Sequence, residues 1–139
     1  MDNLTPDIRR QTMSRVRSKD TKPEWVVRRL VHSMGYRYRL HRADLPGKPD
    51  LVFPKYRKAI FVNGCFWHGH QCRAGRNRPA SNKDYWLPKL EKNKTRDRSH
   101  YRRLRKMGWG IMVIWECQIK KTEVLKKRIR RFLGAGADA

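Results

Sequence analysis

Three cysteines and two nearby histidines have the types and spacing of zinc ligands. Cys65, His70 and Cys72 form a C-x4-H-x-C pattern, and Cys117 follows a later hydrophobic run. Structural zinc sites use four such sulfur and nitrogen donors in a tetrahedron. We therefore expect a closed, structural Cys₃His site that ties a loop to a strand end, with His68 as the rival nitrogen ligand. The competing interpretation is an ordinary buried thiol at Cys117 and a solvated histidine in the loop.

A small set of acidic residues could support phosphodiester hydrolysis. Asp50 follows Pro49 at the start of an expected strand, and His68 lies shortly after the partner strand. A divalent ion held by carboxylates polarises a phosphate, while a histidine accepts a proton from the attacking water. We expect Asp50 and His68 to face one pocket, with Glu24 and Asp97 in supporting roles. The competing interpretations are a turn residue at Asp50 and a favourable helix N-terminal charge at Glu24.

The charge of the chain indicates a polyanionic partner. In 139 residues, 35 Lys and Arg stand against 12 Asp and Glu, which gives a formal net charge of +23. Because the cations are spread along the whole chain, nucleic acid is favoured over an anionic membrane surface. The hydrophobic content of 38% is sufficient for a folded core. No apolar run approaches the roughly 18 residues of a membrane span, and no secretory signal is recognisable, so we expect a soluble intracellular protein.

Aromatic side chains beside cationic ones are candidates for DNA contact. Phe66 and Trp67 lie in a glycine-rich stretch, and Trp86 opens a basic helix. Such side chains can wedge between base pairs, at a lower cost where a mismatch already weakens stacking. The basic N-terminal segment, residues 1–20, is expected to become ordered on DNA. Its candidate phosphate contacts are Arg15, Arg17 and Lys19.

The elements that must position these residues follow from hydrophobic periodicity and from glycine and proline punctuation. They are a helix over 22–34, strands over 36–40, 50–53 and 59–62, a long loop over 64–82, a basic helix to 107, a strand over 109–115 and a helix over 122–133. This order predicts an α/β domain with a central mixed sheet flanked by helices. The expected organisation is a basic segment (1–20), one folded domain (21–133) and a flexible tail (134–139).

Four stretches together carry a family resemblance. They are LPGKPDLVF (45–53), IFVNGCFWHGHQC (60–72), KNKTRDR (92–98) and WECQ (115–118). On these motifs the chain resembles, over nearly all of its length, the very-short-patch repair (Vsr) endonucleases of bacteria. The resemblance implies a restriction-endonuclease-like fold with a structural zinc. It also implies a Mg²⁺-dependent enzyme that acts on double-stranded DNA. Such an enzyme nicks the thymine strand 5′ to the T of a T:G mismatch left by deamination of 5-methylcytosine.

The resemblance also implies roles for individual residues. Asp50 and the backbone carbonyl of Val62 would bind Mg²⁺, His68 would activate water, and Glu24 and Asp97 would support metal-bound waters and the histidine. Zinc would lie on Cys65, His70, Cys72 and Cys117, and Phe66, Trp67 and Trp86 would wedge into the mismatch. The basic N-terminal segment would clasp the DNA.

One departure keeps alternatives open. The family often has Thr-His where this chain has Val62-Asn63, so a side chain near the metal differs while a backbone ligand survives. Asn63 is the best support for a zinc-stabilised DNA-binding module without catalysis. A third interpretation is an endonuclease of the same fold with another specificity. We further expect a cytoplasmic, nucleoid-associated monomer, with mismatch-sensing repair proteins as partners.

Overall fold

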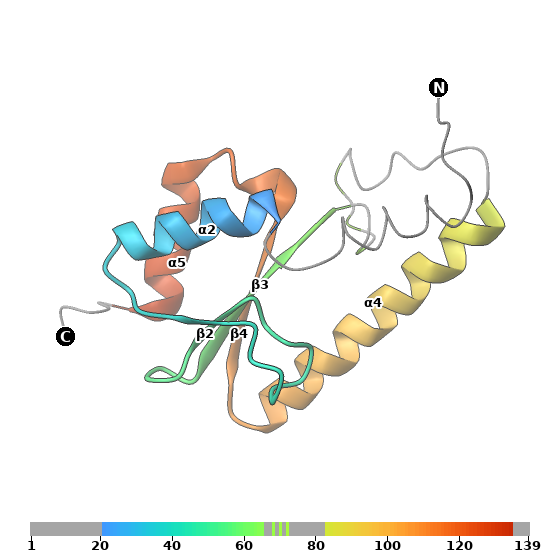
Figure 1. The fold of residues 1–139 in the computed structure, drawn as a ribbon, viewed down its shortest axis with the longest axis horizontal. Helices are drawn as coiled ribbons and strands as arrows, with labels where there is room; N and C mark the ends of the chain where they lie inside the picture. The colour runs from blue at the N-terminus through green and yellow to red at the C-terminus, as the bar shows by residue number, and fades with distance from the viewer. Residues whose placement is uncertain (1–20, 66–67, 69, 71, 73–82, 135–139) are drawn as a thin grey trace.

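A mixed four-stranded sheet forms the centre of the computed structural model, which describes residues 21–65, 68, 70, 72 and 83–134. Strands β1 (Arg39–Leu40), β2 (Leu51–Phe53), β3 (Lys58–Asn63) and β4 (Gly110–Trp115) lie side by side in that order (Figure 1). The pairs β1–β2 and β2–β3 are antiparallel, and β4 runs parallel to β3. A parallel pair requires a long crossover connection. Helix α4 (Lys83–Lys106) lies within that connection.

Alternation along the strands divides the core into two layers. Leu51, Ile60 and Ile114 pack against helices α2 (Lys22–Ser33) and α5 (Thr122–Leu133) on one face. Val52 and Phe61 pack with Leu104 of α4 on the other face. Successive strand side chains point to opposite faces, so strands buried on both sides read as continuous apolar runs. The sheet is therefore covered by helices on both faces.

Helix α2 begins and ends where its sequence specifies. The Thr21 side chain caps it by accepting a hydrogen bond from the Glu24 amide at 3.5 Å, and Pro23 lies in the first turn. Gly35, with φ of +88°, ends the helix in a conformation that glycine adopts at little cost. This cap fixes the start of α2, and with it the position of Glu24.

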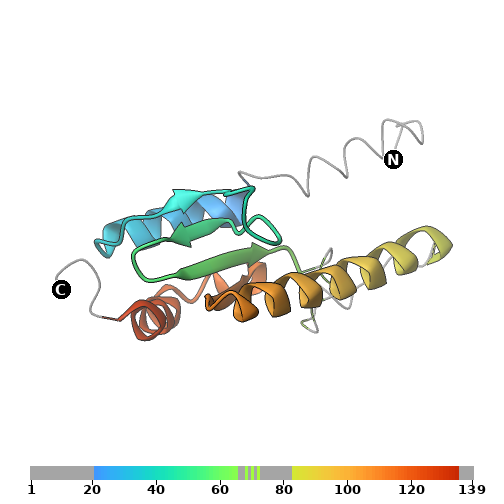
Figure 2. The same ribbon diagram turned by 90° about the horizontal axis from the view of Figure 1, so that it is seen from below.

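Helix α4 is longer than the sheet that it covers. Its C-terminal part packs on β4 and buries Leu104, whereas its N-terminal part projects beyond the strands, away from α2 and α5 (Figures 1 and 2). Within the projecting part, Trp86 and Leu90 form a separate small cluster with Tyr85. Basic residues occur along the whole length of the helix, from Lys83 to Lys106.

The expected α/β class, the hairpin and the mixed sheet are confirmed, with corrections at strand ends. The strand expected over 36–40 is only Arg39–Leu40, because Tyr36 turns inwards and its hydroxyl donates to the Gly134 carbonyl at 2.5 Å. The strand expected from Asp50 begins at Leu51, since the Asp50 side chain accepts from the β3 backbone. Residues 1–20, the cap expected near 81–82 and the tail beyond 134 lie outside the described residues. Within the described part of the chain, no helix has the length and apolarity to cross a membrane.

Candidate active site and metal centre

Asp50 lies directly before β2, and its side chain bonds to the backbone of β3. Pro49 has no amide hydrogen to donate, and one carboxylate oxygen of Asp50 accepts the Val62 amide hydrogen at 2.6 Å. The Val62 amide belongs to β3, just before that strand ends. The carboxylate is therefore fixed at the carboxyl end of β3, close to the loop that carries the candidate histidines.

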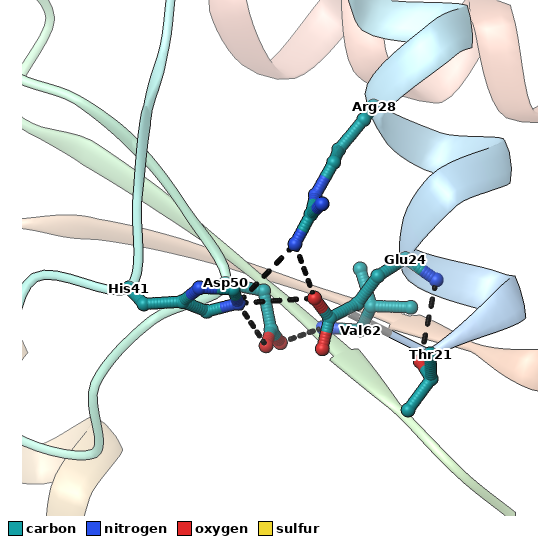
Figure 3. A network of polar contacts seen from close by, with 6 residues as sticks. All are labelled: Thr21, Glu24, Arg28, His41, Asp50 and Val62. Atoms are coloured by element: carbon teal, nitrogen blue, oxygen red, sulfur yellow. Dashed lines mark hydrogen bonds and ion pairs between the residues drawn. The ribbon is translucent and has the colours of Figure 1, made fainter. Parts of the chain in front are cut away.

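Three side chains converge on Asp50 from α2 and from the end of β1 (Figure 3). The Nε2 atom of His41 lies 3.0 Å from Glu24 Oε2 and 3.9 Å from Asp50 Oδ1. Arg28, one turn after Glu24 on α2, donates to the same Glu24 oxygen at 2.8 Å. Glu24 and Arg28 are almost fully buried, so their charges act with little screening by water.

The carboxylate pair has the electrostatics of a cation site. Burial, followed by the nearby charge of Glu24, raises the pKa of Asp50 from 3.8 to about 8. Two carboxylates in one poorly hydrated pocket resist joint ionisation unless a cation neutralises them. Carboxylate oxygens are the ligands that Mg²⁺ and Mn²⁺ prefer. The donor atoms of Glu24, His41 and Asp50 lie within 4.8 Å of one another, so the residues present fit a divalent ion.

His68 and Asp97 form a second ionisable pair. The Nδ1 atom of His68 lies 2.5 Å from an oxygen of Asp97, which comes from the middle of α4. A carboxylate at this position favours a proton on Nδ1 and leaves Nε2 as a free base. Both side chains are only partly buried, with 28% and 19% exposure. The arrangement can accept a proton from water.

Tyr101 is influenced by a carboxylate from each pair, Asp50 of the first and Asp97 of the second. Its hydroxyl accepts a hydrogen bond from Asn63 at 3.0 Å, and Asn63 directly follows Val62. Burial raises the pKa of Tyr101, and the negative charges of Asp97 and Asp50 act in the same direction. Tyr101 is thus within electrostatic reach of both carboxylates. The Asn63 side chain is buried and bonded to α4, so it does not belong to the Glu24–His41–Asp50 cluster.

The cysteines meet as the spacing predicted. The donor atoms of Cys65, His70, Cys72 and Cys117 lie within 4.8 Å of one another. The Cys117 sulfur is 3.6 Å from His70 Nδ1, and Cys117 lies in the short 3-10 helix η1 (Glu116–Gln118) directly after β4. Stacking on Trp115, with ring centroids 4.1 Å apart, orients the His70 ring. His70 thus joins the cluster, while the rival His68 faces Asp97.

The raised thiol pKa values indicate that the cysteine–histidine cluster needs a positive charge to hold thiolates. Burial and the neighbouring thiols raise the pKa of Cys65 to about 12. Several thiolates cannot coexist there without a positive charge, whereas a zinc ion deprotonates coordinating thiols. Three sulfur donors and one nitrogen are a usual structural zinc set. The four residues therefore fit a zinc ion with no ligand position open for catalysis.

A basic hollow lies on α4 near these sites. Tyr101 lines it together with cationic side chains from the same helix, namely Arg98, Arg102, Arg105 and Lys106. Such a row of cations matches a nucleic-acid backbone. Trp86, an expected wedge, is only 6% exposed and packs with Leu90 in the free protein. The other expected DNA contacts, namely Phe66, Trp67, Arg15, Arg17 and Lys19, lie outside the described residues.

Sequence reasoning missed His41, Arg28 and Tyr101. A signal for His41 was present in the strand pairing, because Leu40 pairs with Leu51 and the next antiparallel position places His41 opposite Asp50. Recognising it required the short β1 to be located correctly. Arg28 had a weaker signal in its i, i+4 relation to Glu24.

Comparisons with known proteins agree with this geometry. A family model described as DNA mismatch endonuclease Vsr matches residues 1–74. The chain is 52% identical to the type II nicking enzyme V.XorIIP of Xanthomonas oryzae pv. oryzae, over 95% of this chain and 96% of that protein. It is 40% identical to the type II nicking enzyme V.NmeAIP of Neisseria meningitidis, over 99% and 98% of the two chains. It is 36% identical to the DNA mismatch endonuclease Vsr of Escherichia coli, over 94% and 87%. The chain therefore belongs to the Vsr family of DNA mismatch endonucleases.

Proposed function

We propose that this protein nicks double-stranded DNA at T:G mismatches, cutting the thymine strand 5′ to the T in a Mg²⁺-dependent reaction. Such a nick begins the repair of deaminated 5-methylcytosine. The observation that carries the proposal is a largely buried carboxylate cluster around Asp50 at the end of β3, together with a His68–Asp97 pair. The carboxylates of Asp50 and Asp97 both act electrostatically on Tyr101. Membership of the family supports mismatched DNA as the substrate.

The first part of the chemistry is charge neutralisation at the scissile phosphate. The Val62 amide hydrogen points to Asp50, and the N–H and C=O groups of one strand residue face the same side. The Val62 carbonyl is thus on the side of Asp50, as a shared ligand set requires. A divalent ion held there would neutralise phosphate charge and lower the pKa of an attacking water.

The second part is proton transfer. His68 Nε2 takes the proton of the attacking water, while Asp97 holds Nδ1–H and stabilises the imidazolium that forms. The water oxygen bonds to phosphorus as the bond from phosphorus to the leaving sugar oxygen breaks. The zinc on Cys65, His70, Cys72 and Cys117 would hold the His68 loop against the end of β4, and so keep His68 in place.

Strand-specific nicking tests this proposal. Purified protein with Mg²⁺ is given duplexes that differ only in a T:G or T:A pair, within several methylated-cytosine contexts, with each strand labelled separately. We expect cleavage 5′ to the mismatched T alone. Asp50→Asn and His68→Ala should each abolish nicking while leaving binding to the mismatched duplex largely intact.

Matched controls come from exposed residues of the same types. Asp44 pairs with Arg42 on the surface, and His32 is exposed on α2. Asp44→Asn and His32→Gln should nick at the wild-type rate. Equal cutting of matched and mismatched duplexes would favour an endonuclease of another specificity. Tight mismatch binding without cleavage, with Mn²⁺ also tried, would favour the silent binding module. Action as a monomer and contact with mismatch-sensing proteins remain predictions.

A further inference from the structure

His41 lies between the two carboxylates that the proposed function needs. Its Nε2 atom is 3.0 Å from Glu24 Oε2 and 3.9 Å from Asp50 Oδ1 (Figure 3). Two donors bound to one ion at about 2.1 Å lie about 3 Å apart when adjacent and about 4 Å apart when opposite. The three side chains therefore nearly have the spacing of ligands on a single metal ion.

One nitrogen of the His41 ring faces both an acceptor and a donor. The Glu24 oxygen at 3.0 Å requires a proton on Nε2, whereas Arg28 Nη2, 3.4 Å from the same nitrogen, is itself a donor and requires a bare nitrogen. Neither neutral tautomer suits both neighbours. A cation bound to Nε2 would face both carboxylates with the opposite charge, while Arg28 keeps its hydrogen bond to Glu24 at 2.8 Å.

The backbone at His41 is held in an uncommon conformation. Its φ is +46°, in the left-handed region that residues other than glycine seldom adopt. The residue follows β1 directly, and its amide donates to the Asp50 carbonyl at 3.4 Å. Such strain persists where the surrounding structure imposes it, often at ligand sites. Here it accompanies an inward-facing imidazole ring.

We propose that His41 is a direct ligand of the catalytic metal ion, together with Asp50 and Glu24, and that it makes the site favour Mn²⁺ over Mg²⁺. The inference rests on the proposed function, since it concerns the ion that this function requires. Imidazole nitrogen binds transition-metal ions readily, whereas Mg²⁺ prefers oxygen ligands and retains its waters. A site made only of carboxylates, a carbonyl and water lacks this nitrogen-based preference.

Pulsed electron paramagnetic resonance on Mn²⁺ bound to the full-length, zinc-loaded protein tests the ligand directly. Isotopic labelling of histidine nitrogen assigns any coupling to a histidine. We expect a nitrogen coupling in the wild type that is lost in His41→Gln. The coupling should persist in His68→Ala, which removes the imidazole paired with Asp97, and in His32→Gln, which changes an exposed histidine of α2.

Metal titrations separate ligation from positioning. Glutamine can still donate a hydrogen bond to Glu24 but offers no imidazole nitrogen. His41→Gln should weaken Mn²⁺ binding by about tenfold or more and Mg²⁺ binding by less than about threefold. Equal weakening of both ions would overturn the proposal, because it would assign His41 only the positioning of Glu24.

Two further outcomes are decisive. Absence of nitrogen coupling in the wild type, or its persistence in His41→Gln, overturns the proposal even if the variant is unstable, since the wild-type spectrum needs no variant. Nicking of T:G duplexes without nitrogen coupling refutes His41 ligation and leaves the proposed function standing. Nitrogen coupling in a protein that nicks no duplex supports the ligand assignment and refutes the function.

Discussion

Replacing Asp50 by asparagine removes a negative charge that burial and Glu24 both penalise in the metal-free protein. The asparagine oxygen can still accept the Val62 amide hydrogen, and its amide hydrogens can donate to Glu24. The fold therefore keeps its backbone contact and loses the charge repulsion. We expect Asp50→Asn to be inactive and yet more stable than the wild type without divalent metal.

The size of this effect follows from the pKa of Asp50. It rises from 3.8 to about 8 on folding, and each unit corresponds to about 1.4 kcal/mol. At pH 8 the largest possible gain in the free energy of unfolding of Asp50→Asn is on the order of 5 kcal/mol. Local relaxation and entry of water reduce such penalties, so we expect a measured gain of about 1–3 kcal/mol.

The free energy of unfolding should depend on pH differently in the wild type and in Asp50→Asn. A carboxyl with a raised folded-state pKa binds its proton more tightly in the folded chain, so the wild-type free energy of unfolding falls as pH rises from about 4 to about 8. Asp50→Asn lacks this contribution, and the difference between the two proteins should grow over that interval. Urea unfolding at pH 5, 6, 7 and 8 in chelator-treated buffer that spares zinc measures it.

Adding Mg²⁺ or Mn²⁺ provides the internal control. Either ion should stabilise the wild type by mass action and leave Asp50→Asn nearly unchanged. The reasoning is refuted if metal-free Asp50→Asn is less stable than the wild type at pH 8, or if the two proteins have parallel pH profiles. Asp44→Asn, at an exposed carboxylate, should show neither effect.

Three further changes probe the rest of the site. Cys117→Ser should lower the zinc content measured by metal analysis. Removal of zinc should destabilise the fold by about 2.7 kcal/mol relative to the protein with zinc at 100 times its Kd. An unchanged melting curve after demetallation, verified by metal analysis, would contradict this. Asp97→Asn should reduce kcat by about 10²-fold or more with little change in KM, because His68 loses the acceptor that fixes its Nδ1 proton; wild-type single-turnover rates would exclude the dyad. Arg98→Gln combined with Arg102→Gln should weaken binding to all duplexes alike and reduce the salt slope of log K by about 1 for each lost phosphate contact. Arg131→Gln, on α5, is the control for that pair, and an unchanged slope in the double variant would show that DNA avoids the hollow.

The sequence determined much of the fold through local physics. Helix α2 is bounded by Thr21, Pro23 and Gly35, whose capping and backbone preferences act within a few residues. The apolar run of β3 predicted a strand buried within the sheet, and the structure buries both of its faces. The hydrophobic run of β4 predicted a strand, of which Met112 and Ile114 are buried. The short β1 was overestimated, because Tyr36 is drawn inwards by a contact with Gly134, 98 positions along the chain.

In the candidate site, too, some features were predictable from the sequence and others depended on tertiary structure. Residue types and spacing indicated a zinc set and a hydrolytic carboxylate, since Cys65, His70 and Cys72 share one loop and Asp50 follows a proline that ends strand pairing. Only the tertiary structure distinguished His70 from His68, because that choice depends on Cys117, which lies in η1 after β4, and on Asp97, which lies in α4.

Tertiary structure alone also brought His41 to the carboxylates. Glu24 lies in the first turn of α2, His41 directly follows β1 and Asp50 directly precedes β2, and no local pattern links them. Pairing of β1 with β2 sets His41 opposite Asp50, and packing of α2 on the sheet brings Glu24 to both. The sequence determined which chemical groups were available, and long-range packing decided which of them share one pocket.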